Sequence, residues 1–211
     1  MSGIKDYRTD YSKHELNRKD LPENPIQLFD IWLHEAMDSI ESDANAFILS
    51  TVTANTFPSS RVLLLKEVSD KGFVFFTNYK SQKGQEMELN PKVALNFFWP
   101  SLEKQVRIQG VVEKVSKAES DAYFQSRPYK SRVGAWASEQ SSSLESRAIL
   151  EERYLQFSEK FPEYVPRPTH WGGYLVKPQK IEFWQGRNNR LHDRFSFHFV
   201  ESKWIAVRLA P

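Results

Sequence analysis

The segment IEFWQGRNNRLHDR, residues 181–194, concentrates side chains that could do chemistry. Read as a hairpin, its first four residues form one strand, residues 185–189 form the turn, and the returning strand begins at Arg190. Side chains alternate between the two faces of a strand, so Arg190, His192 and Arg194 would share one face. Three cationic groups on one face repel each other unless an anionic ligand lies between them. A solvated strand edge would produce the same pattern.

A second group of polar residues lies in TNYKSQK, residues 77–83, between a predicted strand and a predicted helix. Here Lys80, Ser81 and Lys83 would stand at the helix N-terminus, where free backbone N–H groups and the helix dipole attract anions. This combination predicts a phosphate-binding turn. An ordinary N-cap with solvated lysines is the alternative.

Tyr123, Arg127 and Ser131 form a third group, in DAYFQSRPYKSR. The first two are four residues apart and hence on one helical face, and Ser131 follows the break at Pro128. A phenol, a guanidinium and a hydroxyl can together hold an anion. An Arg that hydrogen-bonds the last carbonyls of its own helix is the alternative.

Arg61 and Lys66 bracket the apolar run VLLL. Because they differ in parity along a strand, they do not share a face. The simplest interpretation is a strand whose two ends reach water, and alternation alone does not place these residues in one site.

The segments around these groups predict the elements that must position them. Helices are predicted from Pro25 to about Ser42, from Ser81 to Asn90, from Ser116 to before Pro128, and from Ser142 to about Lys160. Strands are predicted at 46–53, 59–66, 72–77, 93–99, 105–115, 171–177, 180–184, 190–199 and 204–208. Helices placed between early and late strands of one sheet indicate a single α+β domain over residues 25–211, with an antiparallel barrel or sandwich. Residues 1–24 are polar and are predicted to be a mobile arm.

The composition narrows the classes of function. The chain has 211 residues and no Cys, which excludes thiolate catalysis, disulfides and cysteine-ligated metals. Its formal net charge of +2 is too small for a protein that wraps nucleic acid. Its five His lack metalloprotease spacing, so we expect no metal site, and the chain has neither a P-loop nor a Gly-rich dinucleotide motif. Since no apolar run approaches a membrane span or a signal-peptide core, we expect a cytoplasmic protein that does not contact membranes.

The polar groups occur within motifs that resemble those of the pyridoxine (pyridoxamine) 5'-phosphate oxidases. The segment IEFWQGRNNRLHDR is similar to the C-terminal signature of that family, in which a Glu-aromatic-Trp element precedes Arg-Leu-His-Asp-Arg. The motifs RVLLLK, TNYKSQK, YFQSRP, GAWASEQSS and RLAP, together with Glu-Lys-Gln-Val at 103–106, occur in the family's order and cover essentially the whole chain. The resemblance implies a split antiparallel β-barrel with flanking helices, which binds FMN at the interface of a homodimer.

The resemblance also implies roles for individual residues. The residues in contact with FMN would be Arg61, Val62, Leu63, Leu64, Leu65, Lys66, Phe76, Thr77, Gln82, Lys83, Gln105, Gln140, Ser141, Trp184 and Arg194. The residues that hold the substrate's phosphate would be Lys66, Tyr123, Arg127 and Ser131. The catalytic pair, Arg190 and His192, would lie beside the substrate's pyridine ring, and Arg8 and Tyr11 would cover the site from the N-terminal arm.

The implied reaction is the oxidation of pyridoxine 5'-phosphate or pyridoxamine 5'-phosphate to pyridoxal 5'-phosphate. We expect hydride to pass from the exocyclic carbon of the substrate to FMN. Dioxygen would then reoxidise the flavin and yield hydrogen peroxide, and the amine substrate would release ammonia. A reduced flavin carries negative charge, so the guanidinium of Arg194 near its electron-rich end would favour the reduced state.

Two positions depart from the family's pattern. Gln82 stands where the family usually has Arg, and the loss of this cation costs about 1.5 to 3 kcal/mol, or roughly tenfold to a hundredfold in FMN affinity. Phe76 stands where the family often has Tyr. Gln82 keeps open a second hypothesis, a split-barrel carrier or sensor that binds FMN and pyridoxal phosphate with little turnover. A nucleic-acid-binding module, suggested by aromatic residues interleaved with Arg, is only weakly supported.

Overall fold

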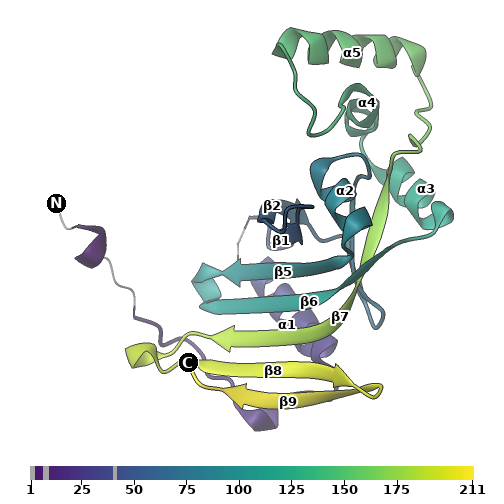
Figure 1. The fold of residues 1–211 in the computed structure, drawn as a ribbon. Coiled ribbons are helices and arrows are strands. Elements are labelled where there is room, and N and C mark those ends of the chain that lie inside the picture. The colour runs from purple at the N-terminus through teal and green to yellow at the C-terminus, as the bar shows by residue number, and fades with distance from the viewer. Residues whose placement is uncertain (1–2, 7–9, 40–41) are drawn as a thin grey trace.

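The computed structural model describes residues 3–6, 10–39 and 42–211, which form one nine-stranded antiparallel sheet with helices around it (Figure 1). The strands are β1 (Ala46–Val52), β2 (Pro58–Leu64), β3 (Glu67–Ser69), β4 (Gly72–Asn78), β5 (Lys92–Trp99), β6 (Lys104–Lys114), β7 (Trp171–Gln185), β8 (Asp193–Val200) and β9 (Lys203–Leu209). The helices are α1 (Pro25–Asp38), α2 (Gln82–Leu89), α3 (Lys117–Ser126), α4 (Tyr129–Ala137) and α5 (Arg147–Lys160). Short 3-10 turns lie at Ile4–Asp6, Arg18–Asp20, Pro100–Leu102 and Asn188–Arg190.

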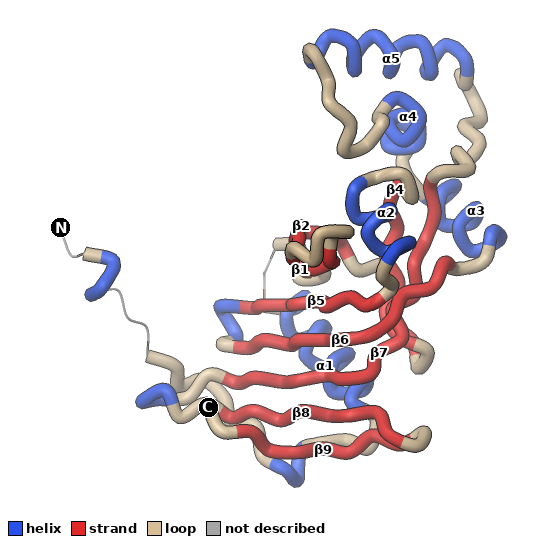
Figure 2. The backbone as a smooth tube through the Cα atoms, viewed as in Figure 1, coloured by secondary structure: helices blue, strands red, loops and turns tan. Residues whose placement is uncertain are grey.

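The long strand β7 is where the sheet divides. One edge of β7 pairs with β6 along its length, while the other edge pairs first with β4, over residues 171–176, and then with β8, over residues 180–185. Figure 2 shows β7 rising from the layer of β5, β6, β8 and β9 toward β4 and the helices. The sheet therefore curls into a half-open barrel, and the predicted α+β split-barrel architecture is confirmed.

The main core lies between α1 and one face of the sheet. The rings of Phe29 and Trp32 on α1 pack edge-on against those of Phe73, Phe97 and Phe183, with centroids 4.9 to 5.2 Å apart. Because side chains alternate along strands, their neighbours point the other way. The opposite face, called the open face below, carries Ile48, Asn96, Phe98, Gln105, Arg107, Glu182, Trp184 and Arg194.

Two predicted helix starts are confirmed by hydrogen bonds at their caps. The Ser81 side chain accepts a hydrogen bond from the Gly84 N–H at the start of α2. Ser116 and Glu119 bond each other's backbone N–H groups in a capping box at the start of α3. These caps set the positions of α2 and α3, which carry predicted site residues.

The predicted start of α5 at Ser142 is wrong. The Ser142 N–H bonds the carbonyl of Glu139 in a turn, and Ser141 has a φ of +75°, so the chain is not helical there. The helix begins at Arg147, after an N-cap residue, Ser146, that makes no side-chain cap bond.

Other elements also differ from the prediction, among them α1, β7 and α4. α1 ends at Asp38 instead of about Ser42. The two strands predicted at 171–177 and 180–184 are one strand, β7. Gln109 pairs with Lys180 and Gly110 with Pro178, so one extra residue of β7 forms a bulge there and pairing with β6 continues on both sides. Helix α4, which follows Pro128, is not predicted by the sequence pattern.

The returning strand of the 181–194 hairpin also begins later than predicted. β8 starts at Asp193, and Arg190 lies in a 3-10 turn where Asn189 and Arg190 have φ values of +57° and +62°. Left-handed backbone cannot continue a strand. The prediction that Arg190 shares a strand face with His192 and Arg194 is therefore wrong.

Residues 10–24, part of the predicted arm, lie along the C-terminal strands. Leu16 belongs to the core, and its backbone N–H donates to the Asp193 carboxylate at 3.2 Å. Lys13 donates its backbone N–H to Glu103 at 3.0 Å. Arg8 lies outside the described residues, and the mobility of the arm stays a prediction.

Candidate functional site

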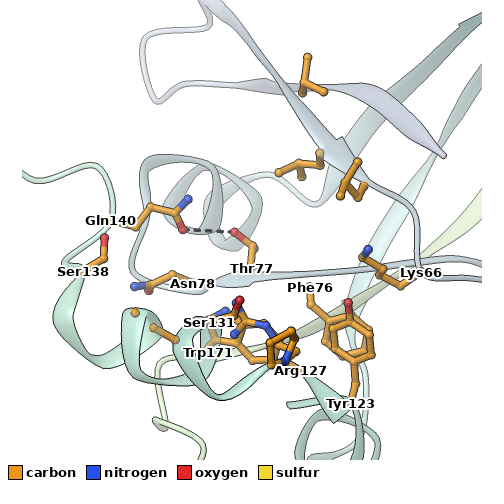
Figure 3. A pocket seen from close by; sticks show the side chains of 16 residues that line it. Lys66, Phe76, Thr77, Asn78, Tyr123, Arg127, Ser131, Ser138, Gln140 and Trp171 are labelled. Atoms are coloured by element: carbon orange, nitrogen blue, oxygen red, sulfur yellow. Dashed lines mark hydrogen bonds between the residues drawn. The ribbon is translucent and has the colours of Figure 1, made fainter. Parts of the chain in front are cut away.

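A cavity of about 690 Å³ opens between β2, β4, α3 and α4. It is lined by ten predicted site residues, Val62, Leu63, Leu64, Lys66, Phe76, Thr77, Tyr123, Arg127, Ser131 and Gln140, and also by Asn78, Pro128, Gly134, Ala135, Ser138 and Trp171. Figure 3 shows the labelled side chains gathered around it. A cavity of this size admits a small organic ligand.

One wall of the cavity is suited to an anion. Arg127 is the C-cap residue of α3, Tyr123 lies one turn earlier, and Ser131 lies in the first turn of α4 (Figure 3). The Nη1 atom of Arg127 is buried and has no hydrogen-bond partner among the described residues, whereas buried donors normally find an acceptor. Burial raises the pKa of Tyr123, partly opposed by the charge of Arg127, so the phenol remains a donor. An anion would satisfy these donors.

Stacked aromatic rings form another wall. The ring of Phe76 lies 3.9 Å from that of Tyr123 and 5.6 Å from that of Trp171, with interplanar angles of 17° and 13°. The Arg127 guanidinium carbon lies 4.6 Å from the Trp171 ring centroid, in a cation–π contact. Phe76, which departs from the family's pattern, thus packs against both Tyr123 and Trp171, whose own rings are nearly parallel with centroids 6.2 Å apart.

The N-terminus of α2 follows two cavity residues, Thr77 and Asn78, after a short turn that ends at the N-cap Ser81. The side chain of Lys83 is buried, and its Nζ lies 3.3 Å from the Ser81 Oγ. Burial, and then the charge of Arg61, lower the pKa of Lys83. A phosphate at this helix terminus would stabilise the buried ammonium, so these residues fit the predicted phosphate-binding turn.

A carboxylate occupies part of this turn. Glu86 accepts hydrogen bonds from the Arg61 guanidinium at 3.1 Å and from the Gln82 amide at 2.8 Å. Burial acts to raise the pKa of Glu86, but hydrogen bonds from Thr51 and Gln82 and the charge of Arg61 outweigh it and lower the pKa. The ionised Glu86 therefore offsets one of the two cations, Arg61 and Lys83.

A second cluster lies on the open face at the far end of β7. Gln105, Trp184 and Arg194 stand side by side on β6, β7 and β8. The Gln105 amide donates to Asn96 at 2.8 Å, and the ring of Tyr11 packs edge-on against Trp184 at 5.7 Å. The strand register thus brings together three predicted flavin contacts with one residue of the N-terminal arm.

His192 joins this cluster from the loop before β8. Its ring centroid lies 4.6 Å from that of Trp184 and 5.8 Å from that of Tyr11, and its Nδ1 accepts a hydrogen bond from the Arg187 N–H at 3.1 Å. Burial, and then the charge of Arg190, lower the pKa of His192. His192 is therefore neutral near pH 7 with its proton on Nε2, while Arg190 itself is exposed.

The two clusters do not meet within one chain. Trp171 lines the cavity at the start of β7, and Trp184 lies thirteen residues later on the same strand, which is roughly 40 Å at about 3.3 Å per residue. In Figure 1, α3 and α4 lie at one end of β7 and the turn before β8 lies at the other.

The remaining predicted contacts lie elsewhere. Arg61, Gln82 and Lys83 meet around the start of α2. Leu65 is buried in the core and exchanges hydrogen bonds with Asn45, and Ser141 lies exposed in the turn before α5. Their roles stay predictions.

Sequence reasoning missed three residues with evident partners in these clusters. Glu86 follows Gln82 by four residues, a helical spacing that predicts their contact. Glu182 precedes Trp184 by two residues, so strand alternation predicts that they share a face. Trp171 has no such local signal, because its partners Tyr123 and Arg127 come from a distant helix.

Neither a metal centre nor a membrane-spanning helix is found among the described residues. Within them, no group of three or more His, Asp or Glu is arranged to hold a metal ion. The same residues include no helix of sufficient length and apolar character to cross a membrane.

Known protein families and relatives match nearly the whole chain. The family model for pyridoxamine 5'-phosphate oxidase matches residues 33–160, and the model for the pyridoxine 5'-phosphate oxidase C-terminal dimerisation region matches residues 171–211. The chain is 50% identical to the pyridoxine/pyridoxamine 5'-phosphate oxidase of Ralstonia pickettii (strain 12J) and 53% identical to that of Thermosynechococcus vestitus (strain NIES-2133 / IAM M-273 / BP-1). Each match covers 100% of both chains.

Solved structures share the fold. The crystal structure of PhzG from Burkholderia lata 383, in complex with tetrahydrophenazine-1-carboxylic acid, superposes with a TM-score of 0.87 at 28% identity, covering 92% of this chain and 95% of that one. A pyridoxamine 5'-phosphate oxidase-related, FMN binding protein from Nostoc punctiforme PCC 73102 gives a TM-score of 0.73 at 16% identity, covering 90% and 100%.

The curled sheet and its flanking helices define a protein of the split-barrel class to which FMN-binding proteins belong. Within this class, the chain belongs to the pyridoxamine 5'-phosphate oxidase family. The predicted family and the predicted class of enzyme, an oxidoreductase, are confirmed.

Proposed function

We propose that the protein uses FMN to oxidise pyridoxine 5'-phosphate and pyridoxamine 5'-phosphate to pyridoxal 5'-phosphate. Dioxygen accepts the electrons and gives hydrogen peroxide, and the amine substrate also gives ammonia. The observation that carries this proposal is the cavity wall in which the buried Arg127 Nη1, Tyr123 and Ser131 present donors beside stacked rings. A phosphorylated aromatic substrate has the matching charge and shape.

Different residues of the chain bind the phosphate of the substrate and the phosphate of FMN. Lys66, Tyr123, Arg127 and Ser131 hold the substrate's phosphate. Arg61, Lys83 and the N-terminus of α2 fit the phosphate of FMN, because they offer a buried ammonium and a guanidinium at a helix terminus. FMN supplies the two-electron redox chemistry.

The cluster at the far end of β7 serves the reacting rings. Gln105, Trp184 and Arg194 contact the flavin, and Tyr11 covers the site. Arg190 faces the ionised oxygen of the substrate's ring, and the neutral His192 can donate from Nε2. Arg194 favours negative charge on the flavin and thereby electron transfer to it.

The site is completed by a second copy of the chain. The substrate-phosphate wall and the catalytic pair lie at opposite ends of β7, too far apart for one small substrate to touch both in a single chain. In a homodimer, the cavity of one protomer would face the cluster of its partner. The match of residues 171–211 to a dimerisation region supports this arrangement.

A carrier or sensor with little turnover is the second candidate. It is favoured by Gln82 and by Glu86, which engages Arg61 and offsets a cation of the phosphate turn. Weak retention of FMN would limit turnover without altering the substrate wall. The predicted cytoplasmic location is not needed for either candidate and stays a prediction.

The test is a visible absorption spectrum of the protein with FMN during anaerobic addition of pyridoxine 5'-phosphate. The proposal expects the oxidised flavin band to bleach and to recover when air is admitted. A bound flavin that stays oxidised would support the carrier or sensor. Failure to retain any FMN would contradict both candidates.

A further inference from the structure

Glu182 is a buried acid between two arginines on the open face. Its side chain is 3% exposed, whereas those of Arg107 and Arg194 are 50% and 24% exposed. Its Oε2 accepts from Arg107 on β6, and its Oε1 accepts from Arg194 on β8. Each arginine thus has its own carboxylate oxygen.

The guanidinium of Arg194 is held from two sides. Its Nε and Nη2 donate to Glu182 Oε1 at 3.1 and 2.7 Å, and its Nη1 donates to the backbone carbonyl of Ala210 at 2.7 Å. Ala210 belongs to the RLAP motif, whose Leu209 lies opposite Arg194 in the β8–β9 register. The RLAP motif therefore has a structural role, because its Ala210 carbonyl helps to fix the Arg194 guanidinium.

The charge of the three groups is not balanced. Burial acts to raise the pKa of Glu182, but the hydrogen bonds and charges of Arg194 and Arg107 outweigh it and lower the pKa, so Glu182 is ionised. One carboxylate against two guanidinium groups leaves one net positive charge beside Trp184 and Gln105. Buried ion pairs add little stability over apolar residues of the same volume, so stability alone does not explain the arrangement.

We propose that Glu182 is a positioning residue that fixes the Arg194 guanidinium on the open face and offsets its charge, thereby setting the reduction potential of bound FMN. The inference rests on the proposed function, because Arg194 must lie beside the flavin. A guanidinium held by fixed partners is preorganised and acts without rearrangement when the flavin becomes negative.

The experiment measures the midpoint potential and the dissociation constant of FMN in the full-length protein. In Glu182→Gln the amide oxygen still accepts from Arg194, so the geometry is kept while one negative charge is lost. We expect the potential to rise, with the ratio of reduced to oxidised flavin increased at least tenfold, which is about 30 mV for a two-electron couple. In Arg107→Gln, where a half-exposed cation is lost, we expect the potential to fall.

Glu113→Gln is the matched control, because Glu113 pairs with Lys177 between the same two strands, β6 and β7, at an exposed site. Its potential should equal that of the unmodified protein. Unchanged potentials in Glu182→Gln and Arg107→Gln, or shifts of the same sign in both, would overturn the proposal. If Glu182→Gln does not fold, the fall expected for Arg107→Gln still decides it. Failure of the unmodified protein to bind FMN would instead contradict the proposed function.

Discussion

Arg190 is an exposed residue with left-handed backbone, in the turn between the end of β7 and the start of β8. We predict that Arg190→Ala leaves FMN binding largely intact but lowers kcat/KM severely, because a charge-assisted hydrogen bond to the ionised substrate ring is lost. Such a bond contributes about 1.5 to 3 kcal/mol, so the loss is roughly tenfold to a hundredfold or more. Flavin fluorescence and steady-state kinetics check this. Unchanged turnover would remove Arg190 from the site, and Lys203→Ala on β9 is the control.

Arg127 has an unpaired buried donor among the described residues and no carboxylate partner in the cavity wall. We predict that Arg127→Ala raises KM for both phosphorylated substrates roughly tenfold to a hundredfold, from the loss of one charge-assisted hydrogen bond. Lys130→Ala, an exposed cation in the first turn of α4, is the matched control. Equal KM values for the two variants would contradict the assignment.

We predict that His192 lowers the stability of the protein in mild acid. Its pKa in the folded state is lowered from 6.5 by burial and by Arg190, so the folded state binds fewer protons than the unfolded state as the pH falls. The stability that neutral His192 contributes is present above pH 6.5 and is lost as the pH falls from 6.5 through the lower folded-state pKa. An NMR titration of the ring should show this lowered pKa and its rise in Arg190→Ala. No change in that variant would exclude Arg190 as a cause.

At the scale of elements, the proposed FMN phosphate site lies at the N-terminus of α2. The helix starts at a confirmed Ser81 cap, yet Gln82 supports Glu86 instead of adding a cation. We predict that Gln82→Arg tightens FMN binding about tenfold to a hundredfold, because the new guanidinium can bind both Glu86 and phosphate. Flavin fluorescence quenching gives the affinity. Gln85→Arg adds the same charge to an exposed position of α2, and equal gains in both variants would show a mere effect of net charge.

At the scale of the whole molecule, the proposed dimer site predicts that activity depends on two chains, because the two clusters are separated along β7. Arg127→Ala damages the cavity and Arg190→Ala damages the far cluster, so each pure variant dimer has two defective sites. A mixed dimer has one site with both lesions and one intact site. After unfolding and refolding an equimolar mixture, random pairing should restore about a quarter of the normal activity. No gain over the separate variants would place both residues in one protomer's site.

The sequence by itself determined the features that depend on near neighbours. Alternation and turn residues predicted most strands, and the Ser81 and Ser116 caps predicted two helix starts, because these signals act over a few residues. The motifs also named ten of the sixteen residues that line the cavity. Where left-handed residues interrupt a pattern, as at Ser141 and Arg190, local periodicity failed to predict the boundary.

Only the tertiary structure decided which of these residues meet. The contact of Arg127 with Trp171 joins segments far apart in the chain, and no local spacing encodes it. Glu182 and Ala210 lie on strands next to that of Arg194, but the register that brings them to its guanidinium was not predicted by the sequence pattern. The separation of the cavity from the Trp184 cluster likewise follows from the length of β7, which the sequence pattern divided into two strands. Short-range patterns specify elements, whereas the register and curl of the sheet fix the distances between them, and those distances are the reason for the proposal that a second chain completes the site.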